Sequence, residues 1–141
     1  MEIKDKIKKE LKSLEKVFER KPKYDLIELP WIDCAEDPVR PDLDLAFRQA
    51  YGRKIFGLRD EDKDIAAIIC FAFTNQVPKT IEEMDSLSKD AAMQAIHRAG
   101  VQGHIAIAYT VWAKKKGGGR AIVNEVYKMI KRSSHLHRLV T

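Results

Sequence analysis

The sequence has few cysteines, no long apolar run and no apolar leader, and each absence argues against a class of protein. Its two cysteines, Cys34 and Cys70, form no Cys-x-x-Cys pair, so neither a disulfide scaffold nor a zinc site is expected. The longest mostly apolar run, Ile65–Phe73, has nine residues, whereas a membrane-spanning helix needs about 20. The N-terminus alternates Lys with Glu and lacks the apolar segment of a secretion signal. We therefore predict a cytoplasmic protein that does not enter membranes.

The composition is that of one globular domain, but the charge is distributed unevenly. Of the 141 residues, 45% are hydrophobic and 33% are charged, which suits a single domain with its own core. Residues 1–24 carry nine Lys or Arg against five Asp or Glu, residues 25–113 carry nine against fifteen, and residues 114–141 carry eight against one. The resulting charges of +4, −6 and +7 give the net charge of +5. The basic C-terminal segment predicts an anionic ligand or partner.

The N-terminal residues predict a helix that precedes the domain. Apolar residues recur at spacings of three and four from Ile3 to Phe18, lysines follow another face, and Pro22 ends the pattern. We therefore divide the chain into an amphipathic helix over residues 1–21 and a domain over residues 22–141. The domain opens with an irregular, proline-rich connection in which Trp31 is expected to anchor the chain on the core.

Within the domain, apolar periodicity predicts an α/β (α+β) fold with a mixed, mostly antiparallel sheet flanked by helices. Thr80 and Glu83 form a capping box, so a helix is expected to begin at Ile81. The apolar run that ends at Ala113 predicts a central strand. The expected order is strand 26–29, helix 42–52, strands 54–58 and 65–73 around an acidic turn, helix 81–99 (continuous or broken near 86–88), strand 104–113, helix 120–132 and strand 135–141.

One segment indicates a specific chemistry. Residues 114–119, three lysines followed by three glycines, join the strand ending at Ala113 to the next helix. Glycines let a ligand approach the main chain, and the free N–H groups and positive dipole end of a helix N-terminus attract anions. With Arg120 beside the lysines, the segment predicts a phosphate or pyrophosphate site; the alternative is a solvated, flexible turn. It is neither a Walker A loop nor a dinucleotide fingerprint, since Ile122 stands where the third glycine is required.

The pattern Lys114-x-x-Gly117-x-Gly119, between a strand and a helix, resembles the Arg/Gln-x-x-Gly-x-Gly/Ala pyrophosphate loop of the GNAT acyltransferase superfamily. The resemblance covers about residues 42–141. It implies a GNAT-like sheet that binds acetyl-CoA or another acyl-CoA and transfers the acyl group to an amine. Lys114 replaces the usual Arg or Gln, which is a mild departure because the family's loop binds mainly through backbone amides.

The resemblance also implies roles for individual residues. The pantetheine arm would follow the main chain of the strand residues Val111, Trp112 and Ala113. The pyrophosphate would lie beside Lys114, on the backbone amides of Gly117, Gly118, Gly119, Arg120 and Ala121. Tyr109 and His104 are candidates for proton transfer, against the alternatives of a core aromatic and a surface residue. Thr74 and Asn75, at the end of a buried strand, are candidates for lining the acceptor site.

Two narrower resemblances concern the same region. Ala72–Pro78, Ile107–Val111 and the three glycines are similar to the catalytic domain of malonyl-CoA decarboxylases and to GNAT-like proteins of marine phages. GNAT domains continue beyond the strand that begins here at His135, with a helix and two strands that complete the acyl pocket. Because the sequence stops at Thr141, we expect a truncated form, a domain that binds without catalysing, or a domain completed by a partner chain.

Two other functions compete with the acyltransferase. A GNAT-like scaffold can serve as an inactive interaction module that holds a protein partner or a second copy. The basic C-terminal third and the lysine-rich first helix can bind nucleic acid, although the chain has no helix-turn-helix or RRM signature and its middle is acidic. His135 and His137 have no Asp, Glu or Cys near them in the sequence, so no metal site is predicted.

Overall fold

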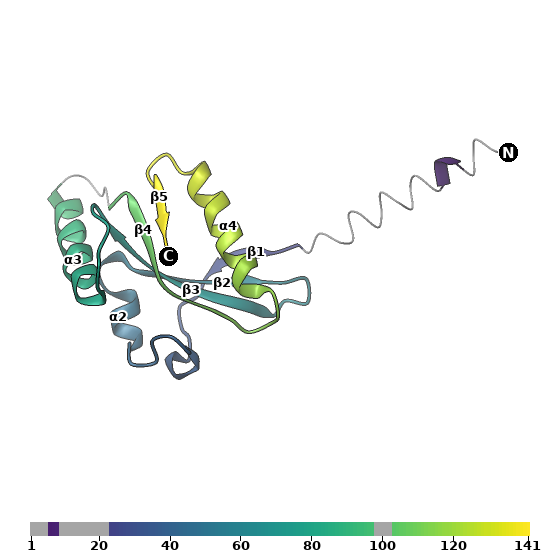
Figure 1. Cartoon of the computed structure of the whole chain (residues 1–141), viewed down its shortest axis with the longest axis horizontal. Helices are drawn as coiled ribbons and strands as arrows, with labels where there is room; N and C mark the ends of the chain where they lie inside the picture. Colours follow the sequence, from purple (N-terminus) through teal and green to yellow (C-terminus); the bar gives the residue numbers. More distant parts are fainter. Residues whose placement is uncertain (1–5, 9–22, 98–102) are drawn as a thin grey trace.

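The domain is built on a sheet whose strands lie side by side in the order of the sequence (Figure 1). The computed structural model describes residues 6–8, 23–97 and 103–141. Its elements are β1 (Asp25–Glu28), η1 (Cys34–Glu36), α2 (Leu45–Gln49), η2 (Ala50–Gly52), β2 (Lys54–Arg59), β3 (Ile65–Thr74), α3 (Ile81–His97), β4 (Ile105–Ala113), α4 (Gly118–Arg132) and β5 (Arg138–Val140). The helix predicted over residues 1–21 lies outside the described residues, apart from the helical residues 6–8. None of the described helices has both the length and the apolar character needed to cross a membrane.

The sheet has five strands and is mostly antiparallel. The first three pairs, β1–β2, β2–β3 and β3–β4, are antiparallel, and β5 adds to β4 in parallel. The predicted mixed, mostly antiparallel sheet flanked by helices is therefore confirmed. As predicted, β4 lies inside the sheet, between β3 and β5, and the middle strand of the five is β3. Residues 66–72 of β3 are all buried, as expected for a strand covered on both faces.

Helices cover both faces of the sheet, with α4 on one face and α2 and α3 on the other (Figure 1). Ile122, Val126 and Ile130 recur every four residues along α4 and are all buried. They pack on the residues of β2, β3 and β4 that face this helix: Leu58, Ala67, Ile69, Phe71, Ala106 and Ala108. The alternate residues form the core on the other face: Ile55, Ile68, Cys70, Ala72, Ile105, Ile107 and Trp112.

Helix α3 begins where the capping box predicts and runs without a break. The N–H of Glu83 donates to Oγ1 of Thr80 at 3.0 Å, which satisfies one of the free amides of the first helical turn. The helix continues through residues 86–88. Ser88 is buried there, and its Oγ accepts a hydrogen bond from Nε of Arg53 at 3.1 Å. This serine therefore ties α3 to the start of β2.

Two predictions for the segment before β2 are wrong. Trp31 does not anchor the chain on the core, because 67% of its surface is exposed; its neighbour Ile32 is buried instead. The helix expected over residues 42–52 is reduced to α2, which is capped by Asp44, and the 3-10 turn η2. Tyr51 takes a left-handed φ of 54°, so the α-helical path ends before Gly52.

Candidate functional site

The glycine loop, residues 114–119, folds back against the start of β3. The N–H groups of Lys114 and Lys115 both donate to the carbonyl oxygen of Ala66, at 2.8 and 3.0 Å. Gly117 has a left-handed φ of +82° and caps α4, and Gly118 lies so close to β3 that a Cβ would stand 2.2 Å from the same Ala66 oxygen. Both positions therefore favour glycine for reasons of the fold. A Cβ on Gly119 would meet nothing closer than 3.9 Å.

The amides predicted to hold a pyrophosphate are not equivalent. The N–H of Gly118 donates to the carbonyl of Lys115 at 3.0 Å, and that of Ala121 donates to the carbonyl of Gly117 at 3.2 Å. Among the described residues, no acceptor faces the N–H groups of the other three, Gly117, Gly119 and Arg120. These three amides, at the positive end of the α4 dipole, are the ones available to an anion.

Two of the four cations around the glycine loop are engaged by carboxylates. The Lys115 ammonium lies 2.5 Å from Asp60 Oδ2 and 3.0 Å from Asp64 Oδ2, and the Lys114 ammonium lies 3.3 Å from Glu36 Oε2. Hydrogen bonds to both aspartates raise the pKa of Lys115 and the bond from Lys115 lowers that of Asp60. Across residues 23–97 and 103–141, the remaining two cations, Lys116 and Arg120, form no ion pair.

The acidic turn between β2 and β3 is therefore joined to the glycine loop as well as being solvated. One carboxylate oxygen from each of Asp60, Asp62 and Asp64 lies within 4.8 Å of the others, the kind of oxygen cluster that binds divalent cations. The ammonium of Lys115 already contacts two of the three carboxylates. This arrangement offsets part of the negative charge of the turn and holds the loop, and we assign no metal to it.

Beyond its first residues, β4 has an open edge, which we define as Ala108–Ala113. β3 pairs with these residues on one side, and on the other side β5 pairs with Ile105–Ile107 only, so no described strand pairs with the open edge on the side away from β3. Because the N–H of Lys114 points to β3, the alternation of an antiparallel ladder turns the peptide groups of Val111 and Ala113 outward and those of Trp112 toward β3. Two of the three residues predicted to meet a pantetheine arm thus present main-chain groups to the open edge, and Trp112 does not.

A β-bulge interrupts β4 at Tyr109. Cys70 pairs with Thr110 and Phe71 with Ala108, which leaves Tyr109 as the extra residue. The Tyr109 ring packs edge-to-face on Phe47, with centroids 5.9 Å apart. Its hydroxyl is buried and has no hydrogen-bond partner among the described residues, and burial raises its pKa. The hydroxyl therefore stays protonated at neutral pH and is a hydrogen donor rather than a base.

Tyr109 also lines a cavity of about 270 Å³ between β4, the end of β5 and the start of α3. Ile81, Met84, Ile107 and Val140 give it apolar walls, and Arg40 and Lys79 lie among its polar lining residues. The lining is about equally polar and apolar, and a cavity of this size and character suits a short acyl group with a polar carbonyl.

The structure does not bring the other candidate residues to this cavity. His104 is exposed one residue before β4, five residues or roughly 16 Å of extended chain from Tyr109, and its ring lies 5.9 Å from that of His137. Thr74 pairs with Ile105, at the opposite end of β4 from the glycine loop, and donates to the carbonyl of Gln76 at 2.6 Å. Asn75 is exposed and donates to Gln94 Oε1 at 3.1 Å.

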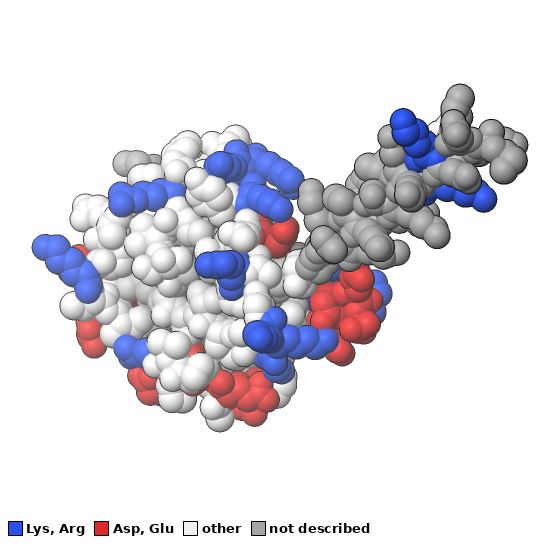
Figure 2. All heavy atoms as spheres, turned by 45° about the vertical axis from the view of Figure 1, so that its right-hand side comes forward, with Lys and Arg blue, Asp and Glu red and all other residues white. Residues whose placement is uncertain are grey.

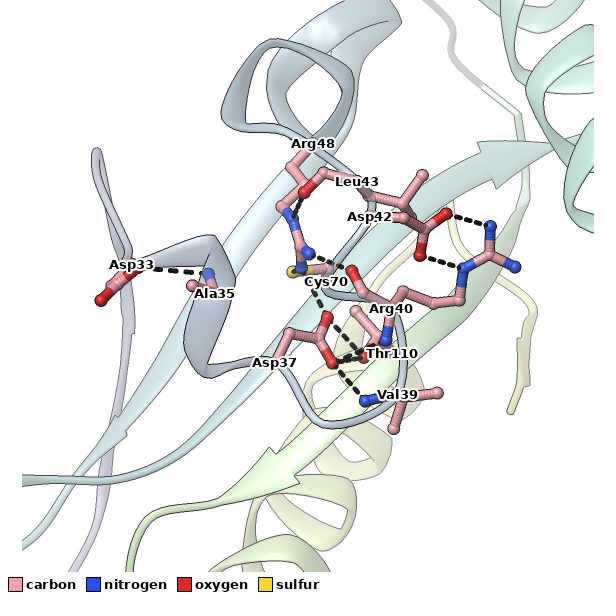
Figure 3. Close-up of polar contacts among 10 residues, drawn as sticks. All are labelled: Asp33, Ala35, Asp37, Val39, Arg40, Asp42, Leu43, Arg48, Cys70 and Thr110. Carbon is pink, nitrogen blue, oxygen red and sulfur yellow. Dashed lines mark hydrogen bonds and ion pairs between the residues drawn. The ribbon is translucent and has the colours of Figure 1, made fainter.

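Sequence reasoning missed the buried polar cluster beneath the bulge (Figure 3). Nη1 of Arg48 lies 2.8 Å from Oδ2 of Asp37 and 3.5 Å from Sγ of Cys70, and Oγ1 of Thr110 lies 2.9 Å from both carboxylate oxygens. Both side chains of the ion pair are fully buried. The cluster ties the 37–43 segment to β3 and to the bulge of β4. Nothing in the spacing of these residues distinguishes Arg48 from a solvated arginine on a short helix.

Comparison of the sequence with protein-family models and with curated proteins finds no match.

Proposed function

We propose that this domain binds an acyl-CoA and transfers its acyl group to an amine, the activity that the GNAT resemblance implies. The observation that carries the proposal is the continuity of three features: the open edge of β4 leads directly into the glycine loop, and the loop leads into a helix start with three unbonded amides. A ligand with an amide-bearing arm and a pyrophosphate is complementary to such a surface. Cytoplasmic acyl-CoA also agrees with the predicted location.

In this proposal the pyrophosphate lies on the amides of Gly117, Gly119 and Arg120. Lys116 and the guanidinium of Arg120 supply the side-chain charge, since Lys115 is held by the acidic turn and Lys114 pairs with Glu36. The helix dipole adds to this attraction because it acts over the first turn. Affinity would therefore depend more on the backbone than on the lysines.

The pantetheine arm would run along the open edge, hydrogen-bonded to the peptide groups of Val111 and Ala113. Four residues, roughly 13 Å of strand, separate Ala113 from Tyr109, so the arm leads toward the bulge and its cavity. The thioester carbonyl would lie there, polarised by a main-chain N–H of the open edge.

The chemistry would be direct attack. The amine nitrogen forms a bond to the carbonyl carbon, the carbon–sulfur bond breaks, and the sulfur leaves as a thiolate. Tyr109, protonated because burial raises its pKa, would donate a hydrogen bond toward the leaving sulfur and keep its proton. The attacking amine loses one proton to solvent and the thiolate takes one proton from solvent, so the products are an amide and free CoA.

Calorimetric titration with acetyl-CoA, malonyl-CoA and free CoA tests the binding. Gly119→Asp places a carboxylate beside the three free amides, where it repels a phosphate. Its negative charge interacts favourably with the positive end of the helix dipole, so we expect the fold to be retained. Asn124→Asp makes the same charge change on an exposed part of α4 and serves as the control. We expect at least a tenfold weaker affinity for Gly119→Asp and an unchanged one for the control. Failure of all three ligands to bind the unaltered protein, or equal losses in the two variants, contradicts the proposal.

Release of free thiol in the presence of primary amines tests the transfer. Tyr109→Phe is expected to keep the affinity for acyl-CoA and to lower the rate of release, because the ring remains and only the hydroxyl is lost. An unchanged rate excludes the Tyr109 hydroxyl from stabilising the leaving sulfur. Binding without any thiol release supports the alternative of an inactive module.

That alternative has one observation in its favour. An unpaired strand edge can accept a strand from another chain, and the open edge offers the peptide groups of Val111 and Ala113 to a second copy as readily as to a pantetheine arm. Light scattering with and without CoA distinguishes the two. If CoA converts a dimer into monomers, the second copy and CoA compete for the same open edge of β4.

A further inference from the structure

A second candidate site lies at the other end of α4, in what we call the basic groove. This groove runs between the C-terminal half of α4 and β5 and has a volume of about 440 Å³. Tyr127, Lys131, His137 and Arg138 are its exposed lining residues, and Ile130 is buried within it. Tyr127 lies eight residues, roughly 12 Å of helix, beyond Gly119 at the end of the glycine loop, so the groove does not belong to the proposed acyl-CoA site.

The basic groove has no acidic residue in its lining. Glu125 is the only Asp or Glu after residue 113, and it lies 3.3 Å from Lys128. Within the described part of the chain, Lys131 and Arg138 therefore have no ion-pair partner. Figure 2, turned so that the right-hand side of Figure 1 comes forward, shows Lys and Arg scattered over the whole visible face of the domain and most Asp and Glu along its lower and right edges. The charge of the groove is thus complementary to a polyanion.

Flat, exposed rings accompany these cations. Tyr127 is 50% exposed, and the Lys131 ammonium lies 4.6 Å from the centroid of its ring. The ring of His137 lies 5.9 Å from that of His104, which is also exposed. Unpaired nucleobases stack on such rings while lysine and arginine contact the phosphates.

We propose that the basic groove binds single-stranded nucleic acid, with phosphates on Lys131 and Arg138 and a base stacked on Tyr127. An acidic protein segment would match the charge but would make no use of the exposed rings. A duplex hides its base faces, and the cavity admits an unpaired base rather than a double helix. Single-stranded nucleic acid is therefore the polyanion that uses both the cations and the rings.

Fluorescence anisotropy with a labelled 12-nucleotide oligothymidine tests this site. The double variant Lys131→Ala/Arg138→Ala should weaken binding at least tenfold. It should also lower the salt dependence, which is the slope of log affinity against log salt concentration, by about 1.4, because each single-strand phosphate contact contributes about 0.7 to that slope. Lys54→Ala/Lys89→Ala removes the same charge from β2 and α3, outside the groove, and should leave the affinity within twofold.

Tyr127→Ala isolates the stacking contribution. It should weaken binding about fivefold or more without changing the salt dependence, and Tyr127→Phe should restore the affinity. Gly119→Asp should bind the oligonucleotide normally, which separates a failure here from a failure of the acyl-CoA proposal. The inference is overturned if the oligonucleotide does not bind at about 50 mM salt or if the two double variants lose affinity equally. It is also overturned if polyglutamate binds as tightly as the oligonucleotide and Tyr127→Ala has no effect.

Discussion

The buried ion pair of Asp37 and Arg48 is the feature whose removal should most affect the stability of the domain. Neither side chain has exposed surface. The carboxylate of Asp37 also accepts from the N–H of Val39 at 2.8 Å, the N–H of Arg40 at 3.0 Å and Oγ1 of Thr110 at 2.9 Å. Arg48 in turn donates to the carbonyls of Leu43 and Arg40. The pair thus joins the loop before α2 to the middle of the sheet.

Asp37→Asn keeps the shape of the side chain and removes its charge. The guanidinium of Arg48 then remains buried without a counter-charge, and removal of one partner of a buried pair costs about 3–5 kcal/mol. This is a large part of the roughly 5–15 kcal/mol by which domains are stable. With a urea m-value of about 2 kcal/mol/M, the midpoint of unfolding should fall by roughly 2 M.

Urea unfolding can be followed by fluorescence, because Trp112 is buried and its ring centroid lies 5.9 Å from the Arg48 guanidinium. Asp42→Asn is the control, since it breaks an exposed pair with Arg40 and should leave the midpoint unchanged. In Asp37→Asn/Arg48→Met, the loss should be smaller than the sum of the two single losses. A loss below about 1 kcal/mol for Asp37→Asn, outside the range for a buried pair, refutes the reasoning.

The same pair predicts an acid sensitivity. Burial alone would raise the pKa of Asp37, but hydrogen bonds from the N–H of Arg40, the guanidinium of Arg48 and other donors outweigh it, so the pKa lies below its usual value of 3.8. A lowered folded-state pKa means that the contribution to stability is present above pH 3.8 and is lost as the pH falls through the folded-state value. Stability of Asp37→Asn should therefore decline less steeply with acid than that of the unaltered protein.

Two further predictions concern the glycine loop and the thiols. Gly118→Ala should lower the melting temperature and cost at least about 2 kcal/mol of stability, because its Cβ would stand 2.2 Å from the Ala66 oxygen. Gly119→Ala has room for its Cβ and should be neutral or stabilising. Thermal melts in which Gly119→Ala is the less stable variant contradict the close approach of Gly118 to β3. Burial raises the pKa of Cys70 to about 11, so at pH 8 iodoacetamide should label half-buried Cys34 and spare Cys70 until the protein unfolds. Peptide mass spectrometry of the labelled protein checks this, and rapid labelling of Cys70 would place it outside the core.

Much of the architecture was predictable because it depends on local patterns. The apolar run of β3, the capping of α3 by Thr80 and the four-residue spacing along α4 each belong to one segment, and each is where the sequence predicts it. The position of the glycine loop between a strand and a helix was predictable for the same reason. Which of its amides remain free was not, because the bonds within the turn depend on how it packs against Ala66.

The sequence by itself determined most of the elements, their order and the basic character of the C-terminal segment, since apolar periodicity, capping and charge are properties of neighbouring residues. Only the tertiary structure decided that Ile32 rather than Trp31 is buried, that Tyr109 is a bulged residue facing a cavity and that Lys115 pairs with Asp60. These outcomes depend on strand register and on contacts between residues far apart in the chain. A one-residue shift in register turns every side chain of a strand to the other face, and local patterns do not specify it.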